Sequence, residues 1–312
     1  MPSTRGTPLS AVSTLLRVPA VIMVLAGLFT TAAHAQDLSP LARVEALGLD
    51  TVKIGRVTAH FAPADRAYAH QLAALSEVAA AYFEHELGVS FPLRLAVLSP
   101  EDWFSPYGGD SMPYGMPWAW VGDLLMAAPA SLDEGVLIFG SDDEATRRRV
   151  QFVLLHEFGH LANKQHLHPE SPHPYSSVFW FEELVATYFA YAYVRAHDPG
   201  WAETSQREWG DYVGGHTPPV LSLDWSFMWD LPPDEFARTY AWYQNLLNLR
   251  AVNLYEQYGL DFLRMVRARL PWENSGEWMT ESLLPALEEI APGFEAWADD
   301  LHSGDYLRRD KD

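Results

Sequence analysis

The chain contains no cysteine. This absence excludes a disulfide framework, a thiolate metal site and a cysteine nucleophile. Basic residues are also scarce, since 21 lysines and arginines face 41 aspartates and glutamates and leave a formal net charge of −20. We therefore expect no nucleic-acid partner, because neutralising phosphates requires a basic surface. With 312 residues and 48% hydrophobic content, the chain has enough apolar material for one large folded domain or two smaller ones.

Hydrophobic runs long enough to cross a membrane are missing as well, and the main apolar stretch lies near the N-terminus. Residues 1–17 contain two arginines and no acidic residue, and an apolar run over residues 18–30 leads to Ala33-His34-Ala35. This order is typical of a cleavable signal peptide with an A-x-A site. The run is shorter than the roughly 20 residues that span a bilayer. We expect cleavage after Ala35, a secreted or periplasmic mature protein, and no membrane insertion after cleavage.

Sequence patterns over the next hundred residues predict a small sheet with helices. Residues 52–61 and 91–98 favour strands, and residues 63–87 favour a helix that ends at the following glycine. The apolar run over residues 135–139 predicts a third strand. Residues 103–123 are crowded with glycine, proline and aromatic residues. This composition is typical of a substrate-lining loop or of a rigid surface loop packed by its own aromatic side chains.

A helical half follows the strands. The capping box Ser141 to Glu144 predicts a helix that continues to about Asn163. A second helix is expected over residues 176–196, and one further helix from Pro232-Pro233-Asp234 to Gly259.

These patterns predict an α+β fold, with a small N-terminal sheet and helices, a pair of helices in the middle of the chain and a mainly helical C-terminal half. The expected organisation is a signal peptide at residues 1–35, a core at residues 36–200 that contains this helix pair and a helical subdomain at residues 201–312. The oligomeric state does not follow from the sequence.

The chemically most informative motif is His156-Glu157-Phe158-Gly159-His160. Residues four apart lie about 40° apart around a helix, so both imidazoles face the same way and can share one metal ion. Neutral imidazole is a natural zinc ligand, and catalytic zinc keeps three protein ligands plus a water. Glu157 lies beside that face, where it can act as a general base on a zinc-activated water. We expect apolar residues on the far face to bury the helix, while the other face presents the two histidines.

The third zinc ligand has two candidates. Glu183 lies on the second predicted helix, which an antiparallel turn would bring back to the motif. Thr187, one turn further, faces the same way and is placed to hydrogen-bond a ligand, whereas Glu182 lies about 100° around the helix. The other candidate is His166, six residues after the motif, provided that Asn163 turns the chain off the first helix.

Two stretches resemble gluzincin zinc metallopeptidases, the group that includes thermolysin-like and aminopeptidase-N-like enzymes. They are residues 153–162 around the motif and residues 180–188, where a tryptophan and then a glutamate precede a small residue and an aromatic residue. The resemblance implies a zincin-like helix pair and a metallopeptidase core at residues 36–200. It also implies one zinc ion per chain, held by His156, His160 and Glu183, with Glu157 as the general base. It also implies a peptide or protein substrate, and a last strand of the sheet that lies beside the cleft.

The sequence also departs from that family. Thr187 stands where thermolysin-like enzymes carry an aspartate. The Gly-x-Met-Glu-Asn motif of the exopeptidases is missing from the sequence, so we expect an endopeptidase. Such families steady the oxyanion with a downstream tyrosine or histidine, and Tyr240 and Tyr243 are the two candidates for this role.

Two alternatives stay open at this point. A metzincin-type peptidase would use His166 as the third ligand and a methionine-containing turn, for which Met228 is the candidate. A non-catalytic envelope protein on a peptidase scaffold would bind a partner through its aromatic surface. We favour an exported zinc-dependent peptidase that hydrolyses peptide bonds, because the residues around Glu183 add a second match to the motif.

Overall fold

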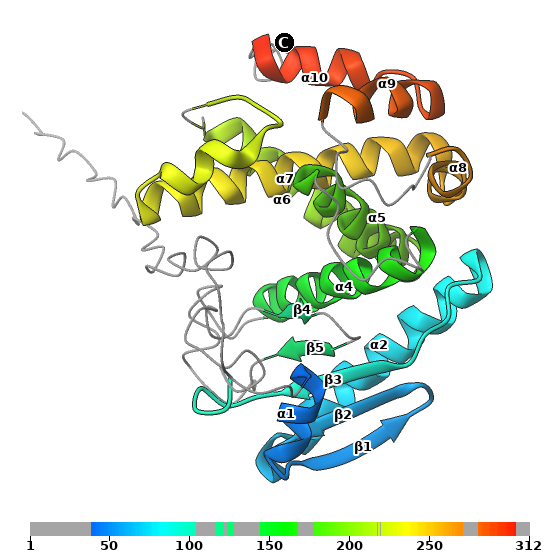
Figure 1. Ribbon diagram of the computed structural model, residues 1–312, viewed down its shortest axis with the longest axis vertical. Coiled ribbons are helices and arrows are strands. Elements are labelled where there is room, and N and C mark those ends of the chain that lie inside the picture. The colour runs from blue at the N-terminus through cyan, green and yellow to red at the C-terminus, as the bar shows by residue number, and fades with distance from the viewer. Residues whose placement is uncertain are drawn as a thin grey trace, which may run out of the picture.

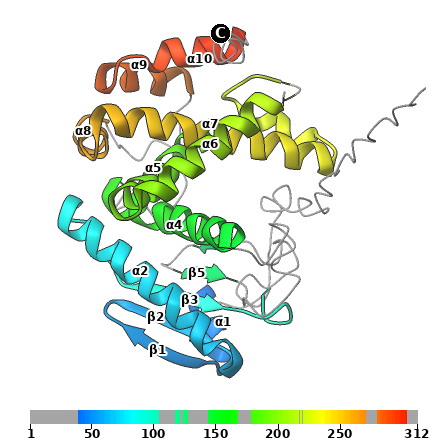
Figure 2. The same ribbon diagram turned by 180° about the vertical axis from the view of Figure 1, so that it is seen from behind.

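The computed structural model combines a small mixed sheet with a stack of helices (Figure 1). It describes residues 39–103, 117–120, 124–127, 144–167, 178–216, 218, 220–270 and 280–303. The sheet lies at one end, the later helices lie at the other, and α4 (Glu144–Leu167) lies between them in both views (Figures 1 and 2). The expected α+β class with a helical C-terminal half is confirmed.

Five strands of the described chain form one sheet in the order β1-β2-β3-β5-β4. They are β1 (Asp50–Ile54), β2 (Val57–Phe61), β3 (Leu93–Val97), β4 (Trp118–Trp120) and β5 (Leu124–Ala127). The three inner strands are parallel, whereas β1 and β4 pair antiparallel at the two edges. One sheet face packs against α2 (Arg66–Leu87) and α4, and the other forms a smaller core with α1 (Pro40–Ala46).

The single strand expected over residues 52–61 is wrong, because this segment is the hairpin of β1 and β2. Gly55 adopts a left-handed φ of +56° at the turn, a conformation that glycine reaches without a steric penalty. The Glu77 carboxylate of α2 packs onto Gly55 and accepts the Arg56 N–H at 2.8 Å. A glycine inside an alternating run is the sequence signal of such a turn.

The other edge of the sheet corrects a second expectation. Residues 118–120 form β4 rather than part of a loop, and they pair with residues 124–126 of the apolar strand β5. This pairing satisfies backbone groups of an aromatic segment whose side chains suit a strand. The strand expected over residues 135–139, together with its position beside a cleft, lies outside the described residues.

Most helix boundaries agree with the sequence predictions. α2 is followed by Gly88, which adopts the left-handed conformation expected after a helix end, and the helix expected from the proline pair to Gly259 is present. The later helices are α5 (Phe179–His197), α6 (Pro199–Gly215), α7 (Pro233–Tyr258), α8 (Asp261–Arg269), α9 (Thr280–Ile290) and α10 (Phe294–Ser303), with short 3-10 helices at Pro63–Asp65 and Trp225–Asp230. Within the described part of the chain, no helix combines the length and apolar character needed to cross a membrane.

Three predictions from the sequence stay untested. The expected signal peptide and Ser141 of the capping box lie outside the described residues. One continuous hydrophobic core contains residues from the sheet, from α4 and α5, and from the later helices. The division of the chain at residue 200 stays a prediction.

α4 and α5 pack against each other at unusually short range. A Cβ atom on Gly159 of α4 would lie 2.4 Å from the Ala186 carbonyl oxygen of α5, so only glycine permits this approach. On the sheet side of α4, Phe158 stacks against Phe83 and Phe91. α4 is therefore covered on both sides, and α5 covers the side that carries the histidines.

Candidate metal centre

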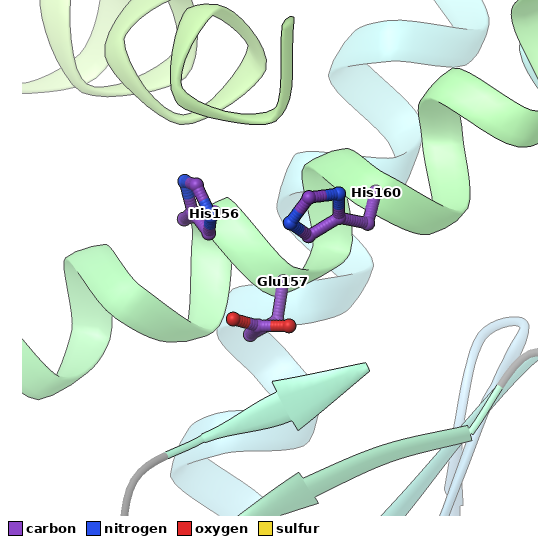
Figure 3. A group of neighbouring side chains, drawn as sticks. All are labelled: His156, Glu157 and His160. Carbon is purple, nitrogen blue, oxygen red and sulfur yellow. The ribbon is translucent and has the colours of Figure 1, made fainter. Parts of the chain in front are cut away.

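α4 carries the three chemically important residues of the motif within little more than one turn. Figure 3 shows the His156 and His160 imidazoles on one side of the helix and Glu157 turned toward the neighbouring strands. One ligand-type atom from each residue lies within 4.8 Å of the other two. The i, i+4 spacing of the histidines produces their convergence, as the sequence predicts. All three side chains are largely covered, because the sheet and α5 enclose this part of α4.

Glu183 reaches the same point from α5. Its carboxylate lies 3.1 Å from His156 Nε2 and 3.5 Å from His160 Nε2. It is only 4% exposed, so these imidazoles supply the polar surroundings that a buried carboxylate needs. The antiparallel return of α5 thus brings Glu183 to the histidines, as expected. Its role as a metal ligand stays a prediction.

Glu182 points to a different part of α4. Its Oε2 accepts a hydrogen bond from Asn163 Nδ2 at 2.7 Å, and both side chains are buried.

Asn163 lies inside α4 and does not turn the chain off the helix, so the turn that the His166 alternative requires is missing. The helical backbone places position 166 about 120° around the axis from position 160. The His166 side chain itself lies outside the described residues.

Burial and mutual charge set the protonation of the cluster. Burial lowers the pKa of His160 to about 4, so this imidazole is neutral at pH 7, the state that binds metals. Burial also disfavours protonated His156, but the hydrogen bond and negative charge of Glu183 outweigh it and raise the His156 pKa. For Glu183, burial opposes ionisation, and the two histidines with Tyr240 outweigh it and lower its pKa.

Glu157 is held on the sheet side of α4. Its Oε2 accepts the Ala119 N–H of β4 at 2.7 Å. Burial raises the pKa of Glu157 to about 8; His156 opposes this rise and the negative charge of Glu183 adds to it. A carboxyl group that titrates near neutrality is suited to proton transfer. The β4 edge thus fixes a candidate acid–base group next to the two imidazoles.

A polar cluster lies behind His156. His156 Nδ1 lies 3.0 Å from Thr187 Oγ1, which is the contact expected from the sequence. Thr187 also lies 3.1 Å from the Gln244 side chain and 3.0 Å from the Asn248 side chain, both on α7. Neither of these two amides is among the site residues predicted from the sequence. Their spacing is a usable signal, because Tyr240, Gln244 and Asn248 follow at intervals of four and share one face of α7.

The two candidate tyrosines have different partners. Tyr240 hydrogen-bonds the Glu183 carboxylate, so its hydroxyl lies at the centre. The Tyr243 hydroxyl donates to the Val220 carbonyl and accepts the Ser222 N–H, both at 2.7 Å. Tyr240 is therefore the one placed to contact a molecule bound at the histidines. Met228, the candidate for a methionine turn, is buried in the main hydrophobic core.

The donor set matches a zinc site. Two imidazole nitrogens and one carboxylate are the three protein ligands that catalytic zinc commonly has, whereas calcium and magnesium prefer oxygen ligands throughout. The Thr187 contact adds the outer hydrogen bond that orients a metal-binding histidine. The residues present therefore fit zinc.

Comparisons of the chain with protein-family models and with characterised proteins found no match.

Proposed function

We propose that the protein is an exported zinc-dependent peptidase, with His156, His160 and Glu183 as the ligands and Glu157 as the general base. The observation that carries this proposal is that His156 Nε2 and His160 Nε2 both lie against the Glu183 carboxylate. Glu157, the residue after His156, is held on the sheet side of the same helix. A purely structural zinc site normally closes with four protein ligands and has no need of an adjacent base.

Each residue has a distinct part in the proposed hydrolysis. Bound zinc supplies a Lewis acid that polarises the peptide carbonyl and increases the acidity of water. Glu157 accepts a proton from the attacking water as its oxygen bonds to the carbonyl carbon, and then donates that proton to the amide nitrogen as the C–N bond breaks. Glu157 ionises more readily once positive charge is held at the adjacent imidazoles. Tyr240 is placed to donate a hydrogen bond to the carbonyl oxygen as it becomes negative.

The variant Glu157→Gln tests the assignment of the base. Glutamine keeps the shape of the side chain but cannot take up the proton, so hydrolysis of an unstructured protein such as casein should fall about 10³-fold. The zinc content of the variant should equal that of the unaltered chain, measured by atomic absorption after purification without chelators. Glu235→Gln, on α7, is a matched control that should retain full hydrolysis. Undiminished turnover in Glu157→Gln would contradict the proposal.

The third ligand has its own test. Zinc should be lost in Glu183→Ala and retained in His166→Ala. The reverse result would replace the gluzincin assignment by the metzincin one while keeping the enzyme class. A zinc-containing protein with four protein ligands and no hydrolysis would support the non-catalytic alternative.

A further inference from the structure

Thr187 stands between His156 and α7. Its hydroxyl oxygen lies 3.0 Å from His156 Nδ1, 3.1 Å from the Gln244 amide and 3.0 Å from the Asn248 amide. A hydroxyl donates one hydrogen bond and accepts two. Of the three neighbours, one must therefore accept the hydrogen of Thr187, and the other two must donate to its oxygen. The role left to His156 decides which of its ring nitrogens carries the proton.

Asn248 has one permitted orientation. One end of its amide lies 3.0 Å from the Gln244 main-chain carbonyl, which only accepts hydrogen bonds. The other end lies 3.2 Å from Trp209 Nε1, which only donates. The amide nitrogen must therefore face the carbonyl and Thr187, and the oxygen must face Trp209. Asn248 thus occupies one of the two acceptor positions of Thr187.

The Gln244 side chain has no such constraint. Its Nε2 donates to Thr187, while its Oε1 is buried without a hydrogen-bond partner among the described residues. With Asn248 and Gln244 both donating, the hydrogen of Thr187 must go to His156 Nδ1. The proton of neutral His156 then lies on Nε2, which faces Glu183 at 3.1 Å. In that tautomer, Nε2 has no lone pair for a metal.

Binding a metal through Nε2 reverses these roles. The proton of neutral His156 must then lie on Nδ1, which donates to Thr187. Thr187 now accepts from both His156 and Asn248, so its own hydrogen needs a new acceptor. Half a turn of the Gln244 amide places Oε1 where Nε2 lies now, within reach of Thr187.

We propose that Gln244 is a positioning residue of the metal site, which accepts the Thr187 hydrogen when His156 binds a metal through Nε2. The proton moves from Nε2 to Nδ1, so the number of protons on the imidazole is unchanged. This inference rests on the proposed function, because it concerns the same site. It adds a residue 57 positions away from Thr187 in the chain.

The variant Gln244→Met tests the inference on the whole mature chain. Methionine keeps most of the side-chain bulk but offers Thr187 no strong acceptor. In the metal-bound form of this variant, the hydrogen of the buried Thr187 hydroxyl has no acceptor. The zinc-free form loses only the hydrogen bond that Gln244 donates to Thr187. Zinc affinity, measured by competition with a chelating dye, should fall about tenfold. The thermal midpoint of the zinc-free protein should stay unchanged.

Asn245→Met is the matched control for that experiment. Asn245 is the next residue on α7, and its amide donates to the Ala241 carbonyl of its own helix. Zinc affinity in this control should equal that of the unaltered chain. Unchanged zinc affinity in Gln244→Met would overturn the proposal. A lower thermal midpoint of zinc-free Gln244→Met would overturn it too, if the loss of stability equalled the loss of zinc-binding free energy. Gln244 would then have a structural role only.

A second measurement needs no metal. Nitrogen-15 NMR of the zinc-free chain, with the His156 signals identified by their loss in His156→Ala, shows which nitrogen carries the proton of the neutral ring. We expect Nε2–H without zinc and Nδ1–H with zinc. A proton on Nδ1 in the zinc-free neutral ring would overturn the proposal. A chain with Nε2–H that binds no zinc would contradict the peptidase assignment and leave the proposed proton arrangement supported.

Discussion

Glu182 and Glu183 are neighbours on α5, and both are almost completely buried, yet they have different partners. Glu183 faces two imidazoles, whereas Glu182 accepts a hydrogen bond from the Asn163 amide. One residue along a helix turns the side chain by about 100°, and this rotation moves it from one part of α4 to another. Burial alone therefore does not distinguish a candidate metal ligand from a packing residue.

The partners of the two glutamates differ in chemistry. A neutral imidazole offers a lone pair to a cation, whereas an amide N–H offers only a hydrogen bond. Glu183 thus lies in a set of donors that can share an ion, and Glu182 takes part in a contact between α4 and α5. Variants of the two glutamates should separate metal binding from helix packing.

The largest effect is expected from Glu183→Gln. Replacing the carboxylate of a proposed ligand by a neutral amide should weaken zinc binding by more than the roughly 100-fold limit seen for outer hydrogen-bond partners. Dye competition measures this loss. Glu182→Gln keeps an acceptor for Asn163 and should retain zinc. Equal losses of zinc in the two variants would show that the comparison between these neighbours has no bearing on metal binding.

The tyrosine pair sharpens the same comparison on α7. Tyr240→Phe removes a hydroxyl that contacts Glu183 and should lower kcat about 100-fold if it steadies the oxyanion. Tyr243→Phe removes two hydrogen bonds to the segment at residues 220–222 and should lower the free energy of unfolding by about 1–3 kcal/mol. Its kcat should change little. A larger loss of kcat in Tyr243→Phe would reverse the two assignments.

A smaller effect is expected where α4 meets α5. Gly159→Ala would push a methyl group into the Ala186 carbonyl and should lower the free energy of unfolding by about 1–3 kcal/mol. Gly210→Ala on α6 is the control, because a Cβ there meets no atom within 4 Å. It should raise the free energy of unfolding by about 0.5–1 kcal/mol, as an alanine in an open helix position does. Chemical denaturation measures both, and equal effects would contradict the close approach of the helices.

Much of the centre could be predicted because it depends on local spacing. The i, i+4 rule places His156 with His160, and the same rule places Thr187 with Glu183. Antiparallel return of α5 is the one additional assumption that brings these pairs together. The Gln244 and Asn248 amides could not be predicted in this way, because they reach Thr187 only through the packing of α7 on α5.

The sheet was harder to predict, because the errors in its prediction concern a turn and the pairing of strands. The alternating pattern of residues 52–61 continues through Gly55. This alternation indicates strand structure but does not mark the turn between the two strands. The β4 segment is surrounded by residues typical of loops, and it forms a strand because β5 pairs with it. The enclosure of α4 likewise depends on tertiary packing, since its own pattern shows only one apolar face.

Zinc per chain is the measurement that tests the central claim most directly. A chain of residues 36–312, purified without chelators, should contain one zinc ion per molecule by atomic absorption. The double variant His156→Ala/His160→Ala should contain none, with a circular dichroism spectrum that shows its helices intact. An unaltered chain that takes up no zinc even after zinc is added back would contradict the metal centre and the peptidase activity that depends on it.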